Sequence, residues 1–201
     1  MSEKLQPIAL DSPVADSNVT LIEALRRRRS NRDFDSAPVS QEHLSGIMWA
    51  AYGANRPDGH KTVPAAWGLY ALDIYAIMPD GAYRYEPETN SLQPVVTGDM
   101  RSYSGMQDYV AYAPLNIVIF VNTDRLQLDD KDMNKILQKN KERVACLDAG
   151  AVAENIYLYC AAEGFNVVER MLASEDSLKK ALKLGRHNDF IVALSIGYPQ
   201  K

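Results

Sequence analysis

The residues of this sequence with the most obvious chemistry are a run of arginines, Arg26 to Arg29, followed by Ser30, Asn31 and Arg32. Five guanidinium groups within seven residues repel one another, so water or a bound anion must compensate them. A guanidinium presents a planar pair of donors that matches two phosphate oxygens, and each charge-assisted hydrogen bond contributes about 1.5–3 kcal/mol. The run therefore indicates either a solvated basic face or an anion-binding site.

The element that must position this run is a predicted helix over residues 21–29. Thr20 is a suitable N-cap, and Glu23 three residues later completes the pattern of a capping box. If the helical repeat continues, Arg28 and Arg32 lie on one face, with Ser30 beside them.

Length and composition bound the class of protein. The chain has 201 residues, 46% hydrophobic and 24% charged, which is close to average globular usage. We expect an N-terminal arm over residues 1–18 and one domain over residues 19–201, because no linker interrupts the pattern. No stretch of about 18 apolar residues is present, so no membrane span is expected. The net charge of −4 argues against a nucleic-acid partner.

The two cysteines, Cys146 and Cys160, are fourteen residues apart, which on a helix is about 21 Å and beyond disulfide reach. We expect reduced thiols and no metal site. The first twenty residues lack the apolar core of a signal peptide, which favours a cytoplasmic protein; an exported protein whose signal has been removed is the alternative.

The remaining pattern alternates between helices and strands. We expect a helix from Gln41, capped by Ser40 and ending at Gly53, and a helix through Glu163 that ends at Gly164. A further helix follows Ser174, with Gly185 as its C-cap. Strands are expected at 69–78, 91–96, 115–121, 166–172 and 190–199, and a hairpin around Asp80-Gly81 is expected over residues 78–87. This order predicts an α+β fold or a three-layer α/β fold.

Five ordered segments resemble the FMN-dependent nitroreductase family. ALRRRRSNRDF looks like the signature R-x-S-x-R-x-F. Arg28, Ser30 and Arg32 fall on the positions of this signature, and Phe34 is the aromatic residue that follows. IMWAAYGANRPDGHKTVP and GAYRYEPETNSLQPVVTGDMR are similar to the branch that contains the thiazole/oxazole-forming peptide dehydrogenases. DAGAVAENIYLYCAAEGFNVV resembles the long central helix of the family, and SIGYP its final strand. The resemblance covers roughly residues 21–199.

The resemblance implies a three-layer α/β/α sandwich with a mixed, largely antiparallel sheet. It implies a homodimer that binds FMN and passes hydride from NADH or NADPH to a small electron-poor acceptor, such as a nitroaromatic or a quinone. The flavin carries this chemistry, so no catalytic side chain is expected. The alternatives are a peptide azoline dehydrogenase and a flavin-binding module without turnover.

By the same resemblance, Arg28 is expected to hold the FMN phosphate, with Arg29 beside it. Ser30 is expected to bond the ribityl chain or the phosphate, and Arg32 to lie near the pyrimidine edge of the flavin. After the last strand, Lys201 is the residue available for the basic phosphate grip that the family often adds.

The rest of the expected site comes from three other segments. Pro64, Ala65 and Ala66 match a segment that reaches the flavin from the second subunit; relatives carry Ser and Asn where this chain has Ala65 and Gly68, so two side-chain hydrogen bonds are absent.

Gln107 is expected to contact the flavin ring, and the backbone N–H of Arg170 or Met171 to face the flavin N5. The alternative for the Arg170 side chain is an ion pair with Glu169 or Asp176.

Overall fold

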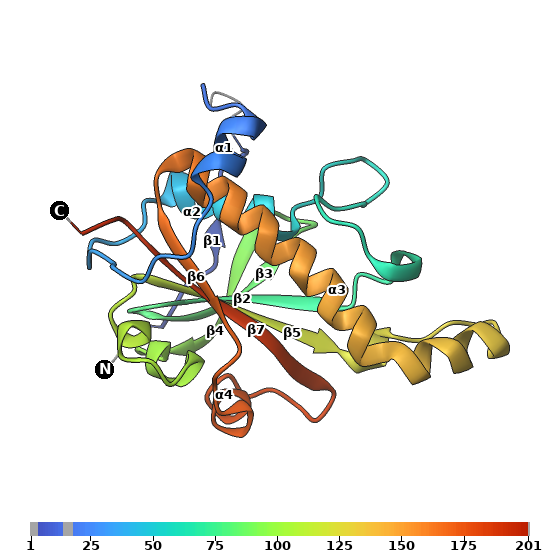
Figure 1. Ribbon diagram of the computed structural model, residues 1–201. Coiled ribbons are helices and arrows are strands. Elements are labelled where there is room, and N and C mark those ends of the chain that lie inside the picture. Colours follow the sequence, from blue (N-terminus) through green and yellow to red (C-terminus); the bar gives the residue numbers. More distant parts are fainter. Residues whose placement is uncertain (1–3, 14–17, 201) are drawn as a thin grey trace.

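The computed structural model describes residues 4–13 and 18–200 and places seven strands in one sheet, in the order β1-β4-β3-β2-β5-β7-β6 (Figure 1). Their bounds are β1 (Ile8–Ala9), β2 (Leu72–Met78), β3 (Gly81–Glu86), β4 (Ser91–Thr97), β5 (Leu115–Asn122), β6 (Asn166–Arg170) and β7 (Asn188–Gly197). The α+β prediction is confirmed. Every described pairing is antiparallel, so the expectation of a mixed sheet is wrong. Strands β5 and β6 run in the same direction, but β7 lies between them and pairs antiparallel with both. No two neighbouring strands of the described sheet are therefore parallel.

Helices cover both faces of this sheet, which confirms the three-layer sandwich. The helices are α1 (Leu21–Arg27), α2 (Gln41–Tyr52), α3 (Lys131–Glu163) and α4 (Glu175–Ala181), with short 3₁₀ turns η1 (Ala66–Gly68), η2 (Arg101–Ser104), η3 (Asp108–Ala111) and η4 (Thr123–Arg125). On β5, Ile117 and Ile119 belong to the core beneath α2 and α3, whereas Val118 and Phe120 belong to the core beneath α4. Burial on both faces explains why this strand is apolar throughout.

The long helix α3 lies across the sheet, and its first turns project beyond it (Figure 1). Asp130 caps its start by accepting hydrogen bonds from two backbone N–H groups, and Gly164 ends it at φ 76°, a left-handed conformation that glycine adopts without strain. Within the described residues, no helix is both long and apolar enough to cross a membrane. Cys146 and Cys160 both lie on α3 as free thiols, as predicted.

Two helix ends differ from prediction. Helix α1 begins after Thr20 as expected, but it ends at Arg27, and Arg28 already has the extended ψ of 122°. Arg28 and Arg32 therefore do not share a helical face. Helix α4 ends at Ala181, before Gly185: Lys183 takes a left-handed φ of 56°, and the N–H of Leu184 bonds to the Lys179 carbonyl. This earlier turn brings Leu182 and Leu184 onto the core.

The N-terminal arm is partly built into the sheet. Residues 8–9 form the edge strand β1 against β4, and Leu10 is buried. The Asn90 side chain donates hydrogen bonds to the carbonyls of Leu10 and Asp11, which holds the arm in place. The expectations for residues 1–3 and 14–17, and for Lys201, lie outside the described residues.

Candidate functional site

A cavity of about 440 Å³ lies beside the arginine run, at the end of α1 and against the last turns of α3. Its lining residues are Arg26, Arg27, Arg28, Arg29, Tyr157, Cys160, Ala161, Gly164, Phe165, Asn166, Val167 and Pro199. Four of these side chains are cationic and none is acidic. The structure thus brings Arg28 and Arg29 to one basic cavity.

The segment after α1 is fixed to the start of β6 by its backbone. The N–H of Asn31 donates to the carbonyl of Val167 at 2.9 Å, and the Asn166 amide donates to the carbonyl of Asp33. The Asn31 side chain accepts from the N–H groups of Arg32 and Asp33. This local turn, rather than a continued helix, sets the directions of the arginines and leaves Arg32 exposed, outside the cavity lining.

Tyr157 connects this segment to the edge of the sheet. Its hydroxyl accepts from the N–H of Glu169 at 2.8 Å and lies 2.8 Å from the Ser30 hydroxyl. Its ring lies beneath Arg28, whose guanidinium carbon is 5.2 Å from the ring centre. Tyr157 was not predicted as a site residue, and no sequence signal distinguishes it from the other apolar residues of α3.

The arginines differ in their partners. Arg26 and Arg27 both pair with Glu23 on α1, the latter at 2.9 Å. Within residues 4–13 and 18–200, no carboxylate forms an ion pair with Arg28 or Arg29. The donors of Arg28 and Arg29 are therefore available to bind an external anion.

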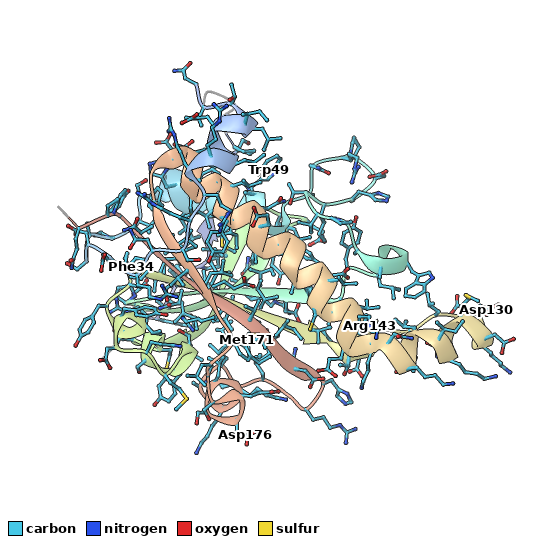
Figure 2. All side chains as sticks on the ribbon, in the orientation of Figure 1. Phe34, Trp49, Asp130, Arg143, Met171 and Asp176 are labelled. Carbon is cyan, nitrogen blue, oxygen red and sulfur yellow. The ribbon has the colours of Figure 1, made fainter. Side chains whose placement is uncertain are left out.

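The edge of β6 leads from this cavity to a second group of predicted residues. Met171 follows β6, four residues and about 13 Å beyond Val167, and its side chain is 75% exposed. The N–H of Met106 donates to the carbonyl of Leu172 at 3.1 Å, which brings the segment containing Gln107 to the same end of β6. The Gln107 Oε1 atom is buried without a partner among the described residues. Figure 2 shows Met171 where β6 leads toward α4.

Arg170 does not form either of the expected ion pairs. Its side chain, 6% exposed, points to the α4 side of the sheet and donates to Ser104, Asn116 and Ser195. Because burial disfavours the charged form, the pKa of Arg170 falls to about 10, so the group remains protonated at neutral pH. Among the residues that the structure describes, no carboxylate forms an ion pair with this buried cation.

The segment Pro64–Ala66 lies elsewhere. Pro64 and Ala65 line a separate cavity of about 500 Å³, and the N–H of Ala66 donates to the Asp148 carboxylate at 3.3 Å. Burial raises the pKa of Asp148. Asp148 precedes Tyr157 on α3 by nine residues, or about 14 Å, so one chain does not bring this segment to the arginine cavity.

The nitroreductase family model matches residues 25–198 of this chain. The chain belongs to the nitroreductase family. Membership supports an oxidoreductase function in general, and the matched range contains the arginine run, α3 and β6.

Two relatives match over most of the chain. A curated protein described as a nitroreductase, from Methanocaldococcus jannaschii, is 28% identical over 176 residues, which cover 83% of this chain and 85% of the relative. A crystal structure described as a nitroreductase, from Ralstonia eutropha, is 34% identical with a TM-score of 0.86, and the match covers 97% of this chain and 90% of that one.

Two further solved structures share the fold. A nitroreductase from Desulfovibrio desulfuricans in complex with FMN is 19% identical with a TM-score of 0.64, covering 92% of this chain and 88% of that one. The Escherichia coli microcin synthetase complex with truncated pro-MccB17 bound is 16% identical with a TM-score of 0.71, covering 93% and 76%. At these identities the likeness is one of fold.

Proposed function

We propose that this chain is an FMN-dependent oxidoreductase that takes hydride from NADH or NADPH and passes it to a small electron-poor acceptor. Family membership supports the class of reaction, and the fold neighbour solved in complex with FMN supports the cofactor. The observation that carries the proposal is the basic cavity at the start of β6.

The residues of that cavity fit the phosphate end of FMN. A phosphate group needs several donors without a competing carboxylate, and the lining supplies Arg28 and Arg29, which form no ion pair within the described residues, whereas Arg26 and Arg27 are paired with Glu23. Arg28 is held by the ring of Tyr157 and has no ion-pair partner among the described residues, so its donors remain available. Ser30 adds a hydroxyl on the same side, because Tyr157 holds it at 2.8 Å.

The opposite end of the site suits the flavin ring. When bound, FMN supplies the two-electron chemistry, and the protein supplies binding, orientation and electrostatics. Gln107 would offer its unpaired amide oxygen, and Met171 an exposed apolar side chain, at the end of β6. Glu169 directs its own N–H to Tyr157 and so takes no part on this edge.

The proposal includes a second copy of the chain. The segment Pro64–Ala66 reaches the flavin only if a partner supplies it, and Ala65 and Gly68 would then act through their backbone alone. Apolar side chains for such an interface are exposed on α1, on α3 and in η1: Leu21, Ile22, Leu25, Met133, Ile136, Leu147 and Trp67. Sedimentation of the protein with the mass of two chains and two bound flavins, rather than as single chains, would support this arrangement.

Exchange of Arg28 tests the phosphate site. Arg28→Gln should weaken FMN binding by about 10- to 100-fold, because charge-assisted hydrogen bonds to phosphate are lost. The matched control is Arg27→Gln, since Arg27 is already paired with Glu23 and should matter little. Titration of flavin fluorescence with each apoprotein gives both affinities. Equal affinities of the two variants for FMN would mean that Arg28 does not bind the phosphate.

A redox experiment separates an enzyme from a flavin-binding module. Anaerobic addition of NADH or NADPH should bleach the flavin absorbance, and a quinone should restore it. A protein that binds flavin but keeps its flavin absorbance after NADH or NADPH is added would be a flavin-binding module without turnover. A peptide azoline dehydrogenase remains the second enzymatic candidate; its support is the shared fold with the microcin synthetase complex, and oxidation of an azoline peptide by the purified protein would favour it.

A further inference from the structure

Arg170 is a buried cation whose acceptors, within residues 4–13 and 18–200, are all neutral. It donates from Nε to the Ser195 hydroxyl at 3.2 Å, from Nη2 to Asn116 Oδ1 at 2.7 Å and to Ser104 Oγ at 3.2 Å, and from Nη1 to the Ser104 carbonyl. These partners come from β7, β5 and η2. One guanidinium therefore joins two strands of the sheet to the segment that follows η2.

The same segment is fixed on both sides of Gln107. The Asn116 amide donates to the carbonyl of Val110, and the N–H of Met106 donates to Leu172 after β6. Gly105 lies against the guanidinium: a Cβ atom there would be 2.5 Å from Arg170 Nη1. Its φ of 178° is extended backbone that any residue adopts, so the close approach of Arg170 is what requires glycine.

We propose that Arg170 is a positioning residue, which holds the Gly105–Gln107 segment against the Met171 turn and so places the Gln107 amide at the flavin ring. This inference rests on the proposed function. The flavin would be contacted by Gln107 and by the backbone after β6, while the guanidinium acts through its contacts with Ser104 and Gly105 on the α4 side of the sheet.

The geometry explains why arginine serves here. Its fork donates in fixed directions to the carbonyl and the hydroxyl of Ser104 and to Asn116 at once, whereas a lysine ammonium is a single point of charge. Burying a cation without a carboxylate costs desolvation energy, and apolar residues could pack the same space at less cost. Polar bonds with fixed directions define the position of the loop more closely than apolar packing does.

A double-mutant cycle on FMN affinity tests this role. Arg170→Gln and Gln107→Ala should each weaken FMN binding by about 10-fold, and the double variant should also lose about 10-fold rather than about 100-fold, because the two residues act through one contact. Arg170→Lys should recover only part of the loss. Flavin fluorescence titration gives the affinities, and a common shift of the visible flavin bands in both single variants is the spectroscopic signature of a displaced Gln107.

Two further variants separate positioning from folding. Gly105→Ala keeps the charge but displaces the guanidinium, so it should reproduce the loss of affinity and the spectral shift even if Arg170→Gln does not fold. Ser45→Ala, which removes a buried hydroxyl bonded to Asp11 and Gln41 far from the site, should lower stability without changing FMN affinity.

The outcomes distinguish this inference from the proposed function. If the wild-type protein does not bind FMN, the proposed function fails. If it binds FMN through Arg28 but the losses of Arg170→Gln and Gln107→Ala multiply, or Gly105→Ala leaves affinity and spectrum unchanged, the positioning role alone is overturned.

Discussion

Arg170 and Lys61 are equally buried, each 6% exposed, yet their charges are compensated in opposite ways. Lys61 bonds Glu88 at 2.9 Å and lies over the rings of Tyr52 and Tyr70. In the described part of the chain, Arg170 has only neutral acceptors. One region thus pairs its buried cation with an exposed carboxylate, and the other holds its buried cation with neutral acceptors among the described residues.

The difference separates a structural cation from one near a site. The Glu88 side chain is 69% exposed, so Lys61 ties the loop before Pro64 to the surface of the sandwich without trapping both charges. At Arg170 the desolvation cost is offset by directed hydrogen bonds to neutral groups. Arg170 also directly precedes Met171, which is proposed to lie at the flavin ring. Uncompensated buried groups of this kind concentrate at functional sites.

The largest effect should come from Arg170→Met, which fills similar space without donors. Ser104 and Asn116 then lose buried hydrogen bonds to a charged group, and we expect a loss of about 3 kcal/mol or more in the free energy of unfolding. Urea denaturation of the apoprotein measures it, and an unchanged m-value would show that compactness is kept. A loss below about 1 kcal/mol would mean that the network contributes little to the fold.

The matched exchange in the other region, Lys61→Met, should cost no more than about 1 kcal/mol. Methionine retains the apolar contacts with Tyr52 and Tyr70, and Glu88 returns to water, where a single exposed carboxylate is well solvated. The same urea experiment compares the two variants directly. Equal losses would remove the distinction between the two cations.

Much of the fold is readable from local sequence. The caps at Thr20 and Ser40 and the stop at Gly164 mark ends of three helices, because side-chain and glycine effects at helix ends are local. The insertion of β7 between β5 and β6 is not readable, because pairing between distant strands depends on how α3 packs. The early end of α4 at Ala181 follows from burial of Leu182, which also depends on tertiary contacts.

The site divides in the same way. The signature brings Arg28 and Ser30 together because both residues belong to one short segment: Arg28 lines the basic cavity, and Ser30 contacts Tyr157 of its lining. Tyr157, which joins them to β6, and the partners of Arg170 come from segments distant in sequence, so no spacing rule connects them. The flavin roles assigned to Arg32, Gln107 and Met171 stay predictions.

The smallest effect, and the one that best defines the Lys61 region, is the pH dependence of Glu88. Burial acts to raise the pKa of this carboxyl, but the hydrogen bond and charge of Lys61 outweigh it, so the pKa is lowered in the folded state. A lowered pKa means that the stability it contributes is present above the unfolded value of 4.5 and is lost as pH falls through the folded value. Glu88→Gln keeps an acceptor for Lys61 and removes only the ionic contribution, so wild type should be the more stable at pH 7 and the two should converge in acid.

Urea denaturation of both proteins at pH 7 and below pH 4 measures this convergence. Glu169 supplies the control with the opposite sign, because burial and the neighbouring Glu154 raise its pKa. A carboxyl with a raised pKa destabilises the fold once it is ionised, so Glu169→Gln should gain on wild type as pH rises. A difference in the free energy of unfolding between Glu88→Gln and wild type that stayed constant over this pH range would mean that the carboxylate does not compensate the charge of Lys61. Lys61 would then be stabilised by neutral contacts, as Arg170 is.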